Sequence, residues 1–240
     1  MRIGIDAREI EDGVVTGIGR PLANFLAHFA QSKHDDHCVL FSTKPAPVPL
    51  TRNTENVVVR QHGTFYWDQV QLTRALRAQH IDLFYSPYYK IPLAARCKKV
   101  SAILDLMYLA WPEYRRELSL PAALYYYTFG KAFARQADRI LTCSQHSKRD
   151  IIRLYGVEPE KIEVIPLSVG DLYRPETDPQ PVEALKKRLG IDGRYLLYVG
   201  NFKPHKNVRG LLSAFGKVAR DIGDLKLVLA GPKTHTYPEL

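Results

Sequence analysis

The sequence of 240 residues lacks any run of about 18 apolar residues, so it predicts no membrane-spanning helix. Its richest apolar stretch, from Val100 to Trp111, is interrupted by Asp105. The N-terminus has neither a long apolar segment nor a small-residue cleavage site, which argues against a secretory signal. From these absences we expect a soluble, cytoplasmic protein.

Cysteine is also scarce: Cys38, Cys97 and Cys143 are far apart and odd in number. They form neither a metal-binding spacing nor a paired disulfide framework, which fits a reducing compartment. The stretch from His34 to His37 (His-Asp-Asp-His) has the residue types of a metal site. Because it precedes a strand, we interpret it as a solvated loop.

The chain carries a net charge of +9. A basic surface suits nucleic acid, anionic lipid headgroups or phosphorylated small molecules. The lysines and arginines are dispersed, and no nucleic-acid-binding module is recognisable, so we expect no nucleic-acid partner.

Short apolar segments alternate with segments of helical periodicity, which predicts an α/β fold with a parallel sheet covered on both faces. One predicted helix has Pro21 in its first turn, and another is capped by Ser144 and ended by Gly156. Further helices are predicted over 67–79 and 119–136. Strands are predicted at 1–7, 38–42, 57–59, 81–86, 99–104, 139–142 and 162–165.

A proline-rich stretch from Gly170 to Pro181 reads as a linker. After it, a single β-α-β unit is predicted from a strand at 195–199, a helix at 207–220 and a strand at 225–230. We therefore expect one domain over 1–170, a linker over 171–190 and a partial second domain over 191–240.

Three loops have residue types suited to ligand binding. Gly17 and Gly19 precede a helix N-terminus and would let a backbone approach an anion closely; the alternative is a plain tight turn. The loop Val199–Asn207 joins a strand to a helix N-terminus and carries Lys206, which suits a departing diphosphate; the alternative is a solvated basic loop. Asp105 follows a strand, where it would orient a sugar hydroxyl or cap a turn.

Six groups of residues resemble, in the same order, motifs of glycosyltransferase family 4, including its mannosyltransferase-like members. The resemblance covers nearly the whole chain. The segments are Gly17–Arg20, Phe65–Gln69 with Phe84–Pro87, Ile103–Leu106, Leu141–Asp150, Ile162–Pro166, and Leu197–Gly200 with Lys206-Asn207.

The resemblance implies a GT-B fold: a complete N-terminal Rossmann-like domain and the first β-α-β unit of a second one. It implies a retaining, metal-independent hexosyltransferase of polysaccharide biosynthesis that needs no cofactor. Its substrates would be a nucleoside diphosphate sugar, with mannose favoured, and a glycan or lipid-linked acceptor. The implied catalytic residues are Asp105 and Lys206; the acceptor-side residues are Arg20 and Ser144; the donor-binding residues are Gly17, Gly19, Gly200, Asn201, Phe202, Lys206 and Asn207.

The chain departs from the family pattern in three places. Leu104 stands where the family usually has a histidine, and Asn201 stands where it often has an arginine, which leaves more of the charge to Lys206. The family's Glu-x7-Glu segment, which holds the sugar and the ribose, would lie beyond Leu240.

Three alternatives stay open. The chain would be a non-catalytic module if a partner chain had to supply the missing half. It would be an unrelated nucleotide-binding α/β protein, such as an epimerase, if Asp35 or Asp36 held a ribose, but both precede a strand. The aromatic stretch Tyr125–Phe133, with Lys131 and Arg135, would be either core or a peripheral membrane contact at the inner face of the membrane.

Overall fold

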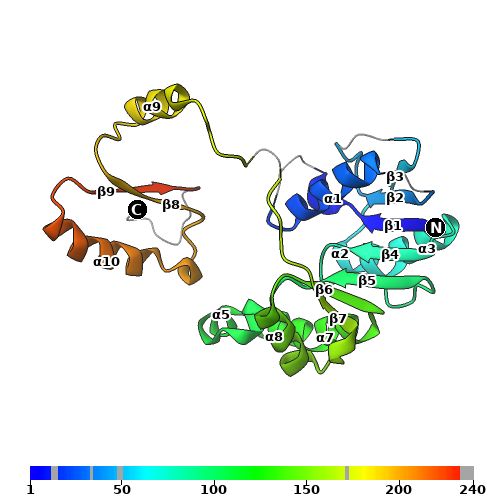
Figure 1. Cartoon of the computed structure of the whole chain (residues 1–240). Helices are drawn as coiled ribbons and strands as arrows, with labels where there is room; N and C mark the ends of the chain where they lie inside the picture. The colour runs from blue at the N-terminus through cyan, green and yellow to red at the C-terminus, as the bar shows by residue number, and fades with distance from the viewer. Residues whose placement is uncertain (12–15, 33–34, 48–50, 171–172, 233–240) are drawn as a thin grey trace. The chain divides into compact units, whose positions relative to one another are not determined.

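The computed structural model describes residues 1–11, 16–32, 35–47, 51–170 and 173–232 (Figure 1). The chain divides into two compact units, unit 1 (Met1–Leu172) and unit 2 (Tyr173–Leu240). Each unit has its own sheet.

Unit 1 contains a seven-stranded sheet in the order β3-β2-β1-β4-β5-β6-β7, in which every neighbouring pair is parallel. The order reverses at β1, which pairs with both β2 and β4, and this reversal is a topological switch point. The parallel sheet confirms the α/β prediction. The strands are β1 (Arg2–Asp6), β2 (His37–Ser42), β3 (Thr54–Val58), β4 (Leu83–Ser86), β5 (Lys98–Ala102), β6 (Arg139–Thr142) and β7 (Ile162–Val164).

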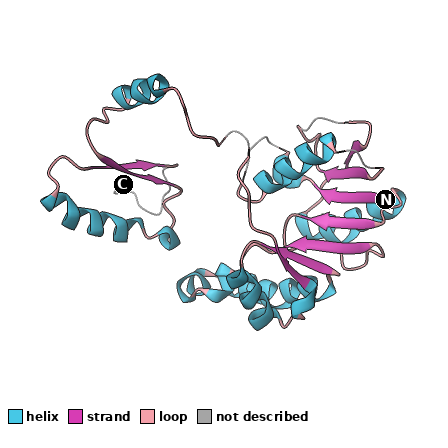
Figure 2. Ribbon diagram, viewed as in Figure 1, coloured by secondary structure: helices cyan, strands magenta, loops and turns pink. Residues whose placement is uncertain are grey.

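Helices cover both faces of this sheet (Figure 2). Successive residues of β2 enter different cores: Val39 and Phe41 pack in one cluster, Cys38 and Leu40 in the other. Helix α1 (Gly19–Gln31) supplies Leu22 and Leu26 to the second cluster. Helices α3 (Leu72–Ala78), α7 (Lys131–Gln136) and α8 (Gln145–Tyr155) pack in the first.

Two of the predicted helices are less regular than expected. The helix predicted over 67–79 is a run of α2 (Thr64–Tyr66), the π-helical segment η2 (Trp67–Gln71) and α3. The helix predicted over 119–136 is a run of α6 (Leu120–Tyr125), the π-helical η3 (Tyr126–Gly130) and α7. In the described part of unit 1, four short helices have no counterpart in the sequence prediction: η1 (Arg8–Ile10), α4 (Met107–Ala110), α5 (Pro112–Glu117) and η4 (Pro159–Lys161).

The predicted caps of α8 are confirmed. Ser144 Oγ accepts a hydrogen bond from the Ser147 amide at 3.1 Å, and Gly156 closes the helix in the left-handed region at φ 61°. A local side-chain choice therefore fixes where α8 begins, directly after β6.

Unit 2 contains α9 (Pro179–Arg188), the parallel strands β8 (Tyr195–Val199) and β9 (Lys226–Ala230), the short η5 (Pro204–Lys206), and α10 (Val208–Asp221). Its small core is built on Phe202 and Val208.

Helix α9 lies inside the stretch that we expected to be a linker. Pro179 occupies the first turn, where a missing N–H is harmless, and Asp178 accepts a hydrogen bond from the Gln180 amide at 2.9 Å. Lys186 and Arg188 in the last turn suit the negative end of the helix dipole. Two of the prolines that indicated a linker, Pro179 and Pro181, therefore lie in the first turn of a helix.

None of the helices in the described ranges combines the length and the apolar character needed to cross a lipid bilayer.

Candidate functional site

The carboxyl ends of the unit 1 strands meet at one edge of the sheet, where open α/β folds bind ligands. A cavity of about 330 Å³ opens there between α1 and the ends of β4, β5 and β6. Thr142 Oγ1, on its wall, is buried and makes no hydrogen bond within the described residues. The wall of the cavity therefore contains a polar atom that a ligand could hydrogen-bond. Other lining residues are Pro21, Asn24, Phe25, His28, Tyr85, Ala102, Leu104, Leu141 and 165–168.

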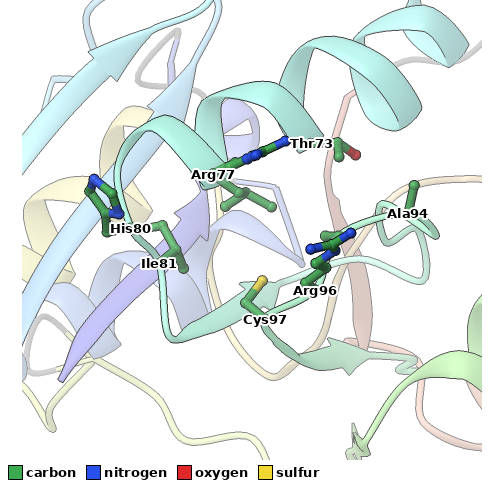
Figure 3. Close-up of a pocket in the computed structure, with 9 residues that line it drawn as sticks. Thr73, Arg77, His80, Ile81, Ala94, Arg96 and Cys97 are labelled. Carbon is green, nitrogen blue, oxygen red and sulfur yellow. The ribbon is translucent and has the colours of Figure 1, made fainter.

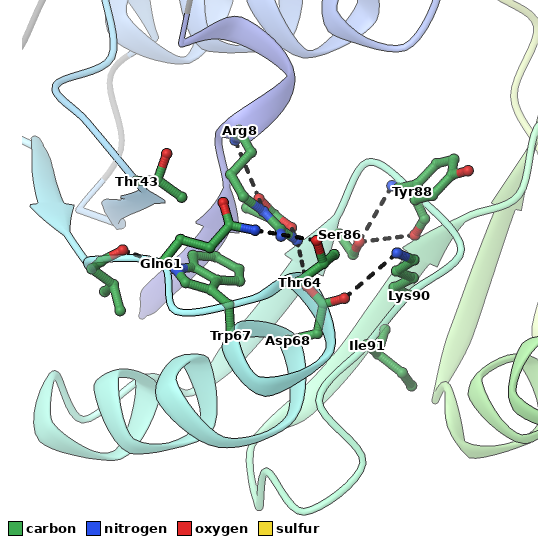
Figure 4. Close-up of polar contacts among 12 residues, drawn as sticks. Arg8, Thr43, Gln61, Thr64, Trp67, Asp68, Ser86, Tyr88, Lys90 and Ile91 are labelled. Carbon is green, nitrogen blue, oxygen red and sulfur yellow. Dashed lines mark hydrogen bonds and ion pairs between the residues drawn. The ribbon is translucent and has the colours of Figure 1, made fainter.

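Beside this edge, Arg8 joins two carboxylates that are distant in the sequence (Figure 4). Its Nη2 donates to Asp6 Oδ2 at 2.6 Å and to Asp68 Oδ1 at 2.7 Å, and its Nε donates to Asp6 Oδ1 at 3.0 Å. The guanidinium carbon lies 3.8 Å from the ring centroid of the buried Trp67. Lys90 Nζ lies 3.6 Å from Asp68 Oδ2. We call these five residues the Arg8 network.

The Arg8 network balances two cations against two carboxylates. Burial opposes the charge on Arg8, but the hydrogen bonds and charges of Asp6 and Asp68 raise the pKa of its guanidinium, which stays ionised. Burial raises the pKa of the Asp68 carboxyl, against the pull of Arg8 and Lys90. Because its charges are largely satisfied internally, the network holds β1, η2 and the loop after β4 in place more than it attracts an anion.

Tyrosines surround the Lys90 end of the network. Lys90 Nζ lies 5.8–6.0 Å from the ring centroids of Tyr88, Tyr89 and Tyr125. Burial raises the pKa of Tyr88 and of Tyr125 to about 12, so both hydroxyls stay protonated at neutral pH. They can therefore donate hydrogen bonds to a hydroxylated ligand.

The glycine-rich loop lies next to η1, and its two glycines have different surroundings. A Cβ on Gly17 would meet nothing within 4 Å, whereas a Cβ on Gly19 would lie 2.7 Å from the Glu9 carbonyl oxygen. Thr16 Oγ1 accepts from the Gly19 amide at 2.8 Å, which already satisfies one donor of the helix N-terminus. The next residue, Arg20, is exposed in the first turn of α1. Gly19 is thus required by backbone packing, and Gly17 is open to a ligand.

Asp105 and the start of α8 line one cavity of about 370 Å³. Asp105 Oδ1 accepts a hydrogen bond from the Met107 amide at 3.1 Å, so it stabilises the turn into α4 while remaining exposed. His146 and Ser147 line the same cavity, and Ser144 caps the helix that carries them. The structure therefore brings Asp105 close to the segment that Ser144 positions.

In unit 2, the loop from Gly200 to Asn207 is held in place by hydrogen bonds to residues of β8 and β9. The Tyr198 hydroxyl donates to the Asn201 carbonyl at 2.8 Å, and the Gly200 amide donates to Ala230 O at 2.9 Å. A Cβ on Gly231 would collide with the Gly200 carbonyl oxygen, so the loop also packs directly on the end of β9. The predicted donor-binding residues Gly200 and Asn201 thus belong to a fixed loop.

The loop leads into α10 through Asn207, whose side chain accepts a hydrogen bond from the Gly210 amide at 3.2 Å. Phe202 is buried, with its ring 6.1 Å from that of Tyr198, so it anchors the loop in the core. Lys206 is exposed, and its ammonium group has no hydrogen bond or ion pair with any residue that the structure describes. It is therefore available to an anion at the helix N-terminus.

The segment that we interpreted as a solvated loop falls partly outside the described residues, since His34 is not among them. Asp36 pairs with the N-terminal ammonium group at 3.0 Å, and His37 lies 3.5 Å from Glu55. Within the described part of the chain, no three histidine, cysteine or carboxylate side chains gather as metal ligands would.

No role is predicted from the sequence for Arg8, Asp68, Lys90 or His146. One signal is present, because Asp6 lies near the end of one predicted strand, Lys90 comes soon after another, and parallel strands end at the same edge. The remaining contacts depend on which strands are neighbours, and the sequence pattern does not state this.

The chain is similar to one family model and to several known proteins. A family model described as Glycosyltransferase Family 4 matches residues 15–170. The O-antigen chain mannosyltransferase B of Escherichia coli is 26% identical over 226 residues, which are 84% of this chain and 56% of that protein. The alpha-monoglucosyldiacylglycerol synthase of Streptococcus pneumoniae is 32% identical over 105 residues, 42% of this chain and 23% of that protein.

Two solved structures share the fold. HepE of Anabaena, in complex with UDP and glucose, matches with a TM-score of 0.66 at 16% identity, over 99% of this chain and 62% of that one. WaaG, a glycosyltransferase involved in lipopolysaccharide biosynthesis, matches with a TM-score of 0.63 at 16% identity, over 95% and 63%. These likenesses confirm the GT-B fold. The chain spans a little over half the length of the mannosyltransferase it matches and under two thirds of these structures.

The two glycines of the first loop can be separated by experiment. We expect Gly19→Ala to lower the free energy of unfolding of unit 1 by about 1–3 kcal/mol, because its Cβ would press on the Glu9 backbone. Gly17→Ala should change it by less than about 0.5 kcal/mol. Urea unfolding followed by tryptophan fluorescence checks this, since both tryptophans, Trp67 and Trp111, lie in unit 1. Equal effects of the two changes would contradict the packing argument.

A second prediction concerns the Arg8 network. Arg8→Met leaves Asp6 and Asp68 buried with only Lys90 nearby, so we expect unit 1 to lose roughly 3–5 kcal/mol of stability. The matched control is Arg74→Met, because Arg74 is exposed on α3 and should tolerate the change. Urea titrations of both variants measure the difference, and similar midpoints would show that the network is not structural.

Proposed function

Because the chain belongs to glycosyltransferase family 4, we propose that it transfers a hexosyl group from a nucleoside diphosphate sugar to a glycan or lipid-linked acceptor, with retention of the anomeric configuration. The proposed sugar is mannose-like, in keeping with the O-antigen chain mannosyltransferase that is similar to 84% of the chain. The proposed setting is polysaccharide biosynthesis in the cytoplasm.

The main support for this proposal is the structure of the Gly200–Asn207 loop in unit 2. Lys206 is exposed, has no ion pair with any described residue, and stands just before the 14-residue helix α10 on a loop anchored by Phe202. As the bond between sugar and diphosphate breaks, negative charge builds on the leaving oxygen. An ammonium group carried by a fixed loop, together with helix-end amides, would stabilise that charge.

We assign the donor diphosphate to the Gly200–Asn207 loop. Gly200 and Asn201 would bring backbone close to the phosphates, and Asn207 would hold the start of α10. Phe202 would contribute indirectly, by anchoring the loop in the core. In unit 1, Gly17 is the glycine that is open to a ligand, whereas Gly19 serves by shaping the loop.

The acceptor is assigned to the carboxyl edge of the unit 1 sheet. Asp105 is exposed in a cavity, so its carboxylate would orient a sugar hydroxyl. Arg20 and the Ser144-capped start of α8 flank this edge as acceptor-side residues. The proposed reaction requires neither a metal nor a cofactor, because Lys206 and the amides supply the positive charge.

We also propose peripheral contact with the inner face of a membrane. Leu120, Leu124 and Tyr127 follow one another at helical spacing, and the two leucines are 82% and 61% exposed. Arg115 and Arg116 are exposed on the preceding helix. Apolar side chains beside basic ones suit a surface of anionic lipid.

The donor assignment is tested at Lys206. We expect Lys206→Ala to weaken binding of nucleoside diphosphate sugars about tenfold or more, since a hydrogen bond to a charged group contributes roughly 1.5–3 kcal/mol. Calorimetric titration of UDP- and GDP-sugars measures this, with Lys217→Ala, exposed further along α10, as the control. Unchanged affinity in Lys206→Ala would remove that residue from the site. Donor binding without transfer would favour the non-catalytic module that needs a partner chain.

The membrane proposal is tested by sedimentation with vesicles. We expect the full chain to bind vesicles containing phosphatidylglycerol more tightly than vesicles of phosphatidylcholine alone, and Leu120→Ser with Leu124→Ser to lose most of that binding. The control pair is Leu185→Ser with Leu189→Ser, because these leucines are also exposed but lie in unit 2. Equal losses in both pairs, or no preference for anionic vesicles, would contradict the assignment.

A further inference from the structure

A further cavity, of about 390 Å³ (Figure 3), opens at the opposite edge of the unit 1 sheet from the candidate site. It lies between the end of α3 and the loop that enters β5 at Lys98. Ile81, on its wall, comes just before β4 begins. The cavity is therefore at the amino ends of the strands, where the substrates of an open α/β sheet do not bind.

The floor of this cavity is apolar and its rim is basic. Leu76, Ile81 and Ala95 are buried beneath it. Arg77 rises from α3 and Arg96 from the facing loop, and both are exposed. Within the described ranges neither guanidinium has a hydrogen bond or an ion pair, and no carboxylate is among the residues that line the cavity. Two cations thus face the same space without a counter-charge.

The other polar groups of the rim add no negative charge. Thr73 Oγ1 already donates to the Gln69 carbonyl at 2.8 Å, so the threonine presents mainly its methyl group. His80 ends the helix at φ 50°, a conformation uncommon for a residue with a side chain, and its imidazole borders the cavity. Cys97 lies on the wall, where burial raises the pKa of its thiol and keeps it protonated.

From these features we propose that the cavity is a binding site for a small organic monophosphate. Arg77 and Arg96 hold the phosphate group, and the apolar part of the ligand lies on Leu76, Ile81 and Ala95. Planar guanidinium groups match phosphate oxygens through paired hydrogen bonds. The volume lies within the range of small-molecule sites, which combine a mostly apolar lining with a few placed polar groups.

This site does not depend on the proposed transferase activity. The diphosphate loop belongs to unit 2 and the acceptor residues to the carboxyl edge of the unit 1 sheet, whereas this cavity uses only residues 73–97. A ligand bound here would contact none of the residues assigned to either substrate. It is therefore expected to bind together with a nucleotide rather than to compete with it.

The test uses hexyl phosphate as the probe and calorimetry of the full chain as the measurement. We expect the variant Arg77→Ala with Arg96→Ala to bind about tenfold or more weakly. Arg77→Lys with Arg96→Lys, which keeps the charge but loses the planar fork, should fall between it and the unmodified chain. The control pair, Arg74→Ala with Arg149→Ala, removes the same charge from exposed positions outside the cavity and should bind normally.

Cys97 reports where the probe binds. Hexyl phosphate should slow alkylation of Cys97 by N-ethylmaleimide, read by peptide mass spectrometry, and should leave Cys143 unaffected. Saturating UDP or GDP should not displace it. The proposal is overturned by unchanged affinity in the Arg77/Arg96 alanine variant, by undiminished Cys97 alkylation, or by competition with the nucleotide. If inorganic phosphate bound with the same affinity as hexyl phosphate, the apolar floor would have no role in binding, and that part of the proposal would be wrong.

Discussion

The bridge that Arg8 makes between Asp6 and Asp68 is the contact on which the candidate site of unit 1 rests. It joins the end of β1 to the π-helical turn η2, which is separated from it by some 60 residues of chain. Lys90 extends the bridge to the loop after β4. Since β1 and β4 flank the switch point of the sheet, this network fixes the loops whose positions define the ligand edge.

The chain uses its cations in two different ways. Arg8 is partly buried between two carboxylates and lies over the ring of Trp67, so its charge stabilises the fold and is not free for a ligand. Lys206, Arg77 and Arg96 are exposed and meet no counter-charge among the described residues. The net charge of the chain is therefore less informative than the partners of each cation, because only an unpaired cation is available to a ligand.

The strands, the parallel sheet and the caps of α8 could be predicted because each depends on local pattern: apolar runs, alternation with helices, and a serine before a helix. The Arg8 network could not be predicted, because it requires β1 to lie beside β4. The order of strands in a sheet does not follow from any local sequence pattern. Gly17 and Gly19 show the same limit. Their motif is the same, yet only contact with the Glu9 backbone distinguishes a glycine needed for packing from one open to a ligand.

The close approach of Gly231 to the Gly200 carbonyl has a mechanical consequence. With no side chain between them, the end of β9 and the start of the Gly200–Asn207 loop act as one rigid corner, joined also by the hydrogen bond from Gly200 to Ala230. A shift of the backbone that leaves β9 is transmitted to this loop without a compressible layer of side chains to absorb it. The position of the loop that carries Lys206 therefore depends directly on the backbone at Gly231.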